Sequence, residues 1–308
     1  MTTLDNATGP ARITVRAPAA FWGGLGVLGF SFSLPATRLA VEDLDPTIVG
    51  LGRALVAAVL AAVLLAVRRE RVPDRADFPR LAVIGVGVVI GFPIFSSIAL
   101  RELSSAHASV IVGLLPAATA AFAVLRAGER PGRGFWFAAL AGLAAVLAFA
   151  ATQGASGIGT GDLAVLAAVA LGALGYAEGG ALSRRYGGWQ VICWALVFTA
   201  PALVPFVAVA IARDGIAASA DAWLGFAYVA LISMFLAFFA WYRGLAEGGV
   251  ARIGQLQLAQ PVLTLVWAAL LLGEEVTAAT VGAALAVLAC VAATQRVRRP
   301  RTRAAASR

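Results

Sequence analysis

The stretch PVLTLVWAALLLGEE, from Pro261 to Glu275, places a proline in an apolar run and ends the run with Gly-Glu. The same pattern occurs earlier, in the stretch PAATAAFAVLRAGER that runs from Pro116 to Arg130. The proline and the Gly-Glu pair both recur after a shift of 145 residues, and that shift also places Leu100 on Leu245. The repetition indicates an internal duplication of the chain.

The composition places this chain in a membrane. Of its 308 residues, 61% are hydrophobic and 13% are charged, whereas soluble domains carry about 25% charged residues. Apolar segments long enough to cross a hydrocarbon core of about 30 Å recur along the chain. Because these segments are continuously apolar rather than alternating, they predict helices and exclude a barrel. Ten transmembrane helices are expected, at residues 20–38, 46–67, 80–101, 104–125, 134–151, 162–183, 189–212, 221–243, 249–272 and 277–295.

The arginines predict the orientation of the helices. One side of the membrane would carry only Arg38, Arg101 and Arg213, while the termini and the loops after spans 2, 4, 6 and 8 carry all the others except Arg53 and Arg252, which lie inside spans. The positive-inside rule then puts both termini in the cytoplasm of a multi-pass protein. The net charge of +8 therefore reflects topology rather than nucleic-acid binding, and the basic C-terminal tail is expected to contact anionic membrane lipid. The absence of lysine, with the excess of alanine and glycine, suggests a bacterial origin and hence the inner membrane.

Each half contains five expected spans, an odd number, so the second half must enter the membrane in the opposite orientation. The expected organisation is a cytoplasmic tail at 1–19, a first five-helix repeat at 20–151, a linker at 152–161, a second repeat at 162–295 and a tail at 296–308. Inverted repeats of this kind are typical of secondary transporters, in which two similar halves can exchange conformations to form outward-open and inward-open states.

The repeated motif suggests two structural devices. Pro116 and Pro261 lie near the middle of spans 4 and 9, where a proline frees a backbone carbonyl and kinks the helix. The glycines of the two Gly-Glu pairs would end their helices, and the glutamates would accept N–H bonds from the start of the next helix. The residues of these pairs are Gly128, Glu129, Gly273 and Glu274.

The repeated motif and the ten spans make the chain resemble a known family. The tandem Pro and Gly-Glu halves, the ten spans and the segment LGRALVAAVLAAVLLAV with Arg53 are similar to the drug/metabolite transporter superfamily and its EamA-domain branch. The resemblance implies a cavity lined by spans 1, 3, 4, 6, 8 and 9, and many members export amino acids or related metabolites. It implies little about which substrate this chain would take.

Charged residues within spans are candidates for the site, because a charge inside a bilayer is rare and often functional. Glu178 in span 6 could carry a proton or recognise a substrate amine. Arg252, which enters span 9 from the cytoplasmic side, could pair with Glu178 as an inner gate or hold a substrate carboxylate. Arg53 is the weaker candidate, because span 2 is expected at the periphery, where packing and snorkelling explain an arginine.

Polar and aromatic residues complete the candidate cavity. Gln257, Gln260 and Thr264 share one helix face beside Gln255, and they could orient a polar solute. His107, the only histidine, lies near the outer end of span 4 and could titrate, although a structural role is common for such a residue. Tyr176, Trp241 and Tyr242 could stack against an apolar or aromatic part of the substrate. Two Gly-x-x-x-Gly patterns, at 87–91 and 175–179, would permit close helix contact.

These residues favour transport over the other classes. Two separated cysteines and one histidine make a multi-ligand metal or haem site hard to build, and without lysine there is no phosphate-binding loop for ATP. We therefore expect no cofactor and no metal. The leading interpretation is a secondary transporter that exports an amino acid or derivative, with proton antiport through Glu178 or facilitated exchange. Drugs or nucleobases as substrates, and a metal-free membrane enzyme, are the alternatives.

Overall fold

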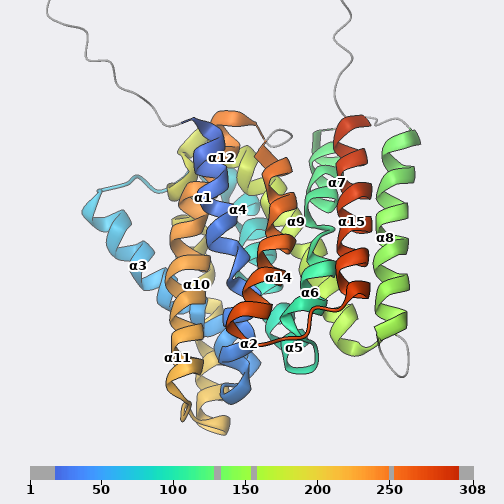
Figure 1. Ribbon diagram of the computed structural model, residues 1–308. Helices are drawn as coiled ribbons and strands as arrows, with labels where there is room; N and C mark the ends of the chain where they lie inside the picture. The colour runs from blue at the N-terminus through green and yellow to red at the C-terminus, as the bar shows by residue number, and fades with distance from the viewer. Residues whose placement is uncertain (1–17, 128–132, 154–157, 250–252, 298–308) are drawn as a thin grey trace, which may run out of the picture.

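The computed structural model describes residues 18–127, 133–153, 158–249 and 253–297. Within these ranges the chain is helical and passes up and down a single bundle (Figure 1). The first half comprises α1 (Ala19–Ser31), α2 (Ser33–Asp43), η1 (Ile48–Gly52), α3 (Arg53–Val67), η2 (Arg75–Asp77), α4 (Phe78–Ile84), η3 (Gly85–Gly91), α5 (Phe92–Glu102), α6 (Ser105–Val112), α7 (Leu115–Ala127) and α8 (Arg133–Gln153). The second half comprises α9 (Thr160–Tyr186), α10 (Gly188–Asp214), α11 (Ala220–Ala227), η4 (Tyr228–Leu236), α12 (Ala237–Gly248), η5 (Gly254–Leu258), α14 (Ala259–Leu271) and α15 (Ala278–Val297).

These elements form the expected ten passes. In chain order, passes 1 to 10 consist of α1–α2, η1–α3, η2–α5, α6–α7, α8, α9, α10, α11–α12, η5–α14 and α15. Eight continuous or nearly continuous helical stretches are long and apolar enough to cross a membrane, and the apolar helices Leu256–Leu271 and Ala278–Ala293 are shorter. The prediction of ten spans in two inverted five-helix repeats is therefore confirmed. The start of α1 and the end of α15 lie at the same end of the bundle, at the top of Figure 1. We call this the termini end, and we call the opposite end, where α2 and α11 lie, the far end.

Several passes are interrupted near the bundle centre, at matching positions in the two halves. The π-helical segments η3 and η4 interrupt passes 3 and 8, and their last residues, Gly91 and Leu236, are 145 residues apart. Pass 4 is broken between α6 and α7, and pass 9 changes from the 3₁₀ segment η5 to α14. Such irregular turns inside membrane helices occur where backbone is buried in protein or lines a cavity.

The prolines explain where passes 4 and 9 change. Pro116 is the second residue of α7, and Pro261 is the third residue of α14. A proline is tolerated in the first turn of a helix, because the N–H group that it lacks would have no partner there. Each proline therefore opens a new helical segment, where the sequence had suggested a bend within one continuous helix.

Glycines allow η3 and α9 to approach closely. A Cβ placed on Gly87 would lie 2.5 Å from the Leu171 carbonyl oxygen and 2.9 Å from the Gly175 Cα. On α9, a Cβ placed on Gly179 would collide with the ring of Tyr242. The predicted close contacts of the two Gly-x-x-x-Gly patterns are thus confirmed. They bring passes 3, 6 and 8 together around the centre of the molecule.

Candidate functional site

A small cavity lies where interrupted passes from both halves meet. Its volume is about 20 Å³, which is room for about one water molecule. Its lining comes from passes 1, 2, 3, 6, 8 and 9 and includes the residues that directly follow the π-helical segments η1 and η3. The lining residues are Phe30, Ser33, Leu34, Arg53, Val88, Phe92, Pro93, Tyr176, Ser233, Met234, Phe238 and Gln260.

Arg53 is the residue that the sequence interpretation undervalued. It is the first residue of α3, directly after the π-helical η1, and it is only 2% exposed. Its Nη1 donates to the Thr37 hydroxyl at 3.4 Å, while Nε and Nη2 have no hydrogen-bond partner. The expectation of a peripheral, snorkelling arginine is therefore wrong. The turn of η1 places this side chain against the cavity, and pass 2 joins the lining while pass 4 does not.

The glutamines of pass 9 occupy different positions. Gln260 lines the cavity, and its Oε1 has no hydrogen-bond partner. Gln257 is 2% exposed, and its Nε2 also has no partner, but it lies outside the lining. Gln255 belongs to η5. Thr264 donates to the Ser31 carbonyl oxygen at 2.6 Å, so it satisfies backbone at the break between α1 and α2.

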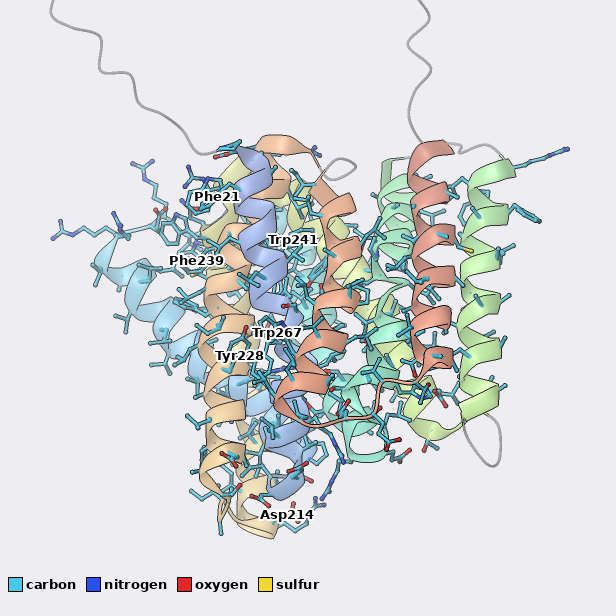
Figure 2. All side chains as sticks on the ribbon, viewed as in Figure 1. Phe21, Asp214, Tyr228, Phe239, Trp241 and Trp267 are labelled. Carbon is cyan, nitrogen blue, oxygen red and sulfur yellow. The ribbon has the colours of Figure 1, made fainter. Side chains whose placement is uncertain are left out.

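The aromatic candidates form one cluster beside the cavity. Tyr176 lies in the lining, with its ring centroid 5.9 Å from that of Trp241 and 5.9 Å from that of Phe238. Trp241 and Tyr242 are almost fully buried behind the lining, and the Tyr242 hydroxyl donates to the Gly175 carbonyl oxygen at 3.4 Å. Figure 2 shows Trp241 closer to the termini end than Tyr228 and Trp267.

Tyr228 and Trp267 surround the break in pass 1. The Tyr228 hydroxyl donates to the Gly29 carbonyl oxygen at 3.0 Å, and the Trp267 indole donates to the Ser31 hydroxyl at 2.9 Å. Both rings also meet Phe32, the residue between α1 and α2, in edge contacts. Passes 8 and 9 therefore hold the interrupted helix that contributes Phe30 and Ser33 to the cavity.

Glu178 takes part in a charged network at the termini end. It is 3% exposed and forms an ion pair with the Nε of Arg80 on α4. Next to this pair, Asp77 accepts from Arg185 and, at 2.7 Å, from the Tyr186 hydroxyl. The network ties η2 and α4 to the end of α9. Arg252, the partner that the sequence suggested for Glu178, lies outside the described residues.

Glu274 joins the two halves at the far end. Its carboxylate accepts from the Ser105 N–H and hydroxyl, both at 2.9 Å, and from the Ala106 N–H at 2.8 Å. Gly273, with φ of 64°, ends the pass in the left-handed conformation that suits glycine. The sequence predicted that the glutamate accepts from the next helix, which is wrong for Glu274, since it caps α6 of the other repeat. Gly128 and Glu129 lie outside the described residues.

His107 also lies at the far end, away from the cavity. Its Nε2 is 2.7 Å from Asp162 Oδ1, and its ring packs against Phe149. The other oxygen of Asp162 accepts from the Gly159 N–H at 2.9 Å and so caps the start of α9. This arrangement gives the histidine structural contacts between passes 4 and 6. Across the described ranges, no group of three His, Cys, Asp or Glu side chains gathers as a metal site would require.

The fold and cavity together define a class of protein. Two inverted five-helix repeats around a central cavity are the architecture of a membrane transporter. The family model for the EamA-like transporter family matches residues 17–151 and 159–294, so it covers both repeats. The chain belongs to the EamA-like transporter family.

Similar proteins agree with this membership. An uncharacterized transporter of Bacillus subtilis, YdeK, is 49% identical over 274 residues, which cover 89% of this chain and 96% of that protein. A probable terminal-alkyne amino-acid exporter of Streptantibioticus cattleyicolor is 26% identical over 258 residues, covering 81% and 84% of the two chains. A solved crystal structure with 19% identity has a TM-score of 0.63 and covers 90% of this chain and 98% of its own, which shows a shared fold.

Proposed function

We propose that this transporter exports a small amphipathic metabolite, an amino acid or a derivative, through the central cavity by alternating access. The observation that carries the proposal is the cavity itself, whose lining combines aromatic side chains with Arg53 and Gln260, two residues that have buried polar atoms without hydrogen-bond partners. Buried polar atoms without partners are costly unless a ligand or water satisfies them. The terminal-alkyne amino-acid exporter among the relatives supports the same class of solute.

A conformational change is part of this proposal. A cavity of about 20 Å³ holds about one water molecule, so a metabolite requires the passes to separate. At the termini end, separation would break the network that joins Arg80 to Glu178 and Asp77 to Arg185. At the far end it would break contacts between α2 and α11, where the Ser219 N–H donates to Asp43 at 2.8 Å. Alternate opening of these two ends would expose one cavity to each side in turn.

Glu178 offers a route for proton coupling. In the described conformation Arg80 supplies a positive charge next to its carboxylate. When α4 moves away from α9, a proton could take over the charge compensation that Arg80 provided. A proton bound on one side and released on the other would drive export. Facilitated exchange without protons is the competing mechanism. In that case the ion pair would only hold α4 and α9 together at the termini end.

The orientation follows from the distribution of arginine. Arg68, Arg80, Arg185 and Arg243 all belong to the termini end of the passes, and the tail after the last pass is strongly basic. By the positive-inside rule this end would face the cytoplasm, and we propose a bacterial inner membrane as the location. Export would then load the cavity from the termini end and release the solute at the far end.

Flux in liposomes tests this function. The full chain is reconstituted, and uptake of labelled amino acids, nucleobases and cationic drugs is measured with and without a pH gradient. Saturable flux of an amino acid that the gradient accelerates, and that Glu178→Gln uncouples from pH, is the expected result. Amino-acid flux that ignores the gradient would leave a facilitator or exchanger. Flux of nucleobases or drugs alone would overturn the proposed solute class.

A further inference from the structure

Arg53 is an unusual charge for the interior of a membrane protein. It is 2% exposed, and no ion pair to it occurs within the described ranges. Two of its three guanidinium nitrogens, Nε and Nη2, lack hydrogen-bond partners. A buried charge is costly unless it is paired and hydrogen-bonded. In the described conformation, two charged N–H donor groups of Arg53 therefore have no acceptor.

Arg53 lines the cavity in which a solute would bind. Among the described residues that line it, Arg53 is the single charged side chain, and the lining contains no carboxylate. Nε and one Nη nitrogen form the two-pronged edge of a guanidinium, which matches the two oxygens of a carboxylate. We infer that Arg53 is the anchor for the carboxylate of the transported solute, an inference that rests on the proposed function.

The rest of the lining fits the remainder of an amino acid. The Gln260 Oε1 has no partner and can accept from an ammonium group. Phe30, Tyr176 and Phe238 form an aromatic wall with ring centroids 5.0–6.1 Å apart. This wall can pack against an apolar side chain or face a cationic group. The cavity thus presents one anion site, one acceptor and one apolar surface.

This charge pattern disfavours two other kinds of solute. A cationic drug would meet the positive Arg53 with no carboxylate in the lining to balance it. A neutral nucleobase would leave the guanidinium charge uncompensated in the closed cavity. A solute with a carboxylate removes that cost, and a zwitterion also uses Gln260. Arg53 would therefore set specificity in favour of carboxylates.

Matched analogues test the anchor. The full chain, in detergent and in liposomes, is challenged with leucine, leucinamide, 4-methylpentanoate and 3-methylbutylamine, and with the same four forms derived from phenylalanine. Thermal stabilisation and competition for flux report binding. For the wild type, the two carboxylates of a set should bind about 10- to 100-fold more tightly than the amide and the amine, as expected for a charge-assisted bidentate contact. In Arg53→Gln this preference should disappear.

Further variants keep the test decisive if Arg53→Gln does not fold. Arg53→Lys retains the charge but loses the two-pronged edge, so it should keep only part of the preference. Gln260→Glu places a fixed carboxylate in the cavity, and it should weaken binding of carboxylates while strengthening binding of the amine. Arg213→Gln, at an exposed far-end arginine, is the matched control and should leave the preference unchanged.

The possible outcomes separate the anchor from the transport function. Carboxylate preference in the wild type that is lost in Arg53→Gln supports the anchor. Saturable amino-acid flux with equal affinity for the carboxylate and the amide, unchanged in the Arg53 variants, overturns the anchor and leaves the transport function standing. Absence of binding and flux for every analogue in the wild type overturns both.

Discussion

The contact between Glu274 and α6 allows a quantitative prediction about how the two repeats are held together. Glu274→Gln keeps the shape of the side chain and one oxygen, which can still accept from Ser105. The amide NH₂ would then face the Ala106 N–H, which donates to the carboxylate at 2.8 Å. One charge-assisted bond is lost and a donor is left without an acceptor, which costs about 1–3 kcal/mol. The negative charge near the N-terminus of α6 is lost as well, which adds about 0.3–1 kcal/mol.

The assay is thermal unfolding of the purified protein in detergent, followed by tryptophan fluorescence. A loss of about 2 kcal/mol should lower the Tm by about 4–8 °C, if the dependence seen in domains of 150–250 residues applies. Glu275→Gln is the matched control, because the neighbouring glutamate is exposed and should melt like the wild type. Equal Tm values for the two variants would refute the idea that Glu274 clamps the repeats.

Two further predictions concern the termini end and the contact of passes 3 and 6. Gly87→Ala should destabilise the protein by at least about 1–3 kcal/mol, because its new Cβ would lie 2.5 Å from a backbone oxygen of α9. Gly24→Ala, with open space at its Cβ, should be neutral or stabilising, and similar Tm values for the two would contradict the packing. Asp77→Asn should cost about 1–2 kcal/mol, because this buried carboxylate accepts from both Arg185 and Tyr186. The control is Asp74→Asn, at a carboxylate that is 67% exposed, which should change the free energy of unfolding by less than about 0.5 kcal/mol. Both variants are measured by chemical denaturation. A larger loss of stability at Asp74 than at Asp77 would contradict the expectation that the buried ion pair contributes more.

The fold could be predicted from the sequence because its signals are local. Apolar runs of membrane-spanning length need no knowledge of their neighbours, and the motif shared by Pro116 and Pro261 revealed the duplication. An odd number of passes in each half then required inversion. The glycines at 87 and 175 likewise marked a close contact, since a missing side chain permits approach whatever the partner is.

The candidate site was harder to predict because its residues are defined by partners far away in the chain. The position of its helix suggests a peripheral Arg53, but the side chain directly follows the π-helical segment η1 and lines the cavity. The sequence places the charge of Glu178 inside a span, and the side chain is buried, yet its partner Arg80 comes from α4. The sequence suggests that Glu274 caps the helix that follows it, whereas its carboxylate caps α6 of the other repeat. Hydrophobic patterns identify helices but do not identify which helices touch.

Alternating access requires that a single cavity opens to each side of the membrane in turn. This requirement can be probed with a cysteine at Ser233, a lining residue from η4, in a chain whose Cys193 and Cys290 are replaced by alanine. Membrane-impermeant thiol reagents are applied from either side of oriented vesicles, with and without leucine. We expect the cysteine to be labelled from both sides, with leucine changing the labelling rates on the two sides in opposite directions. Labelling from one side only under all conditions, or from neither, would contradict it.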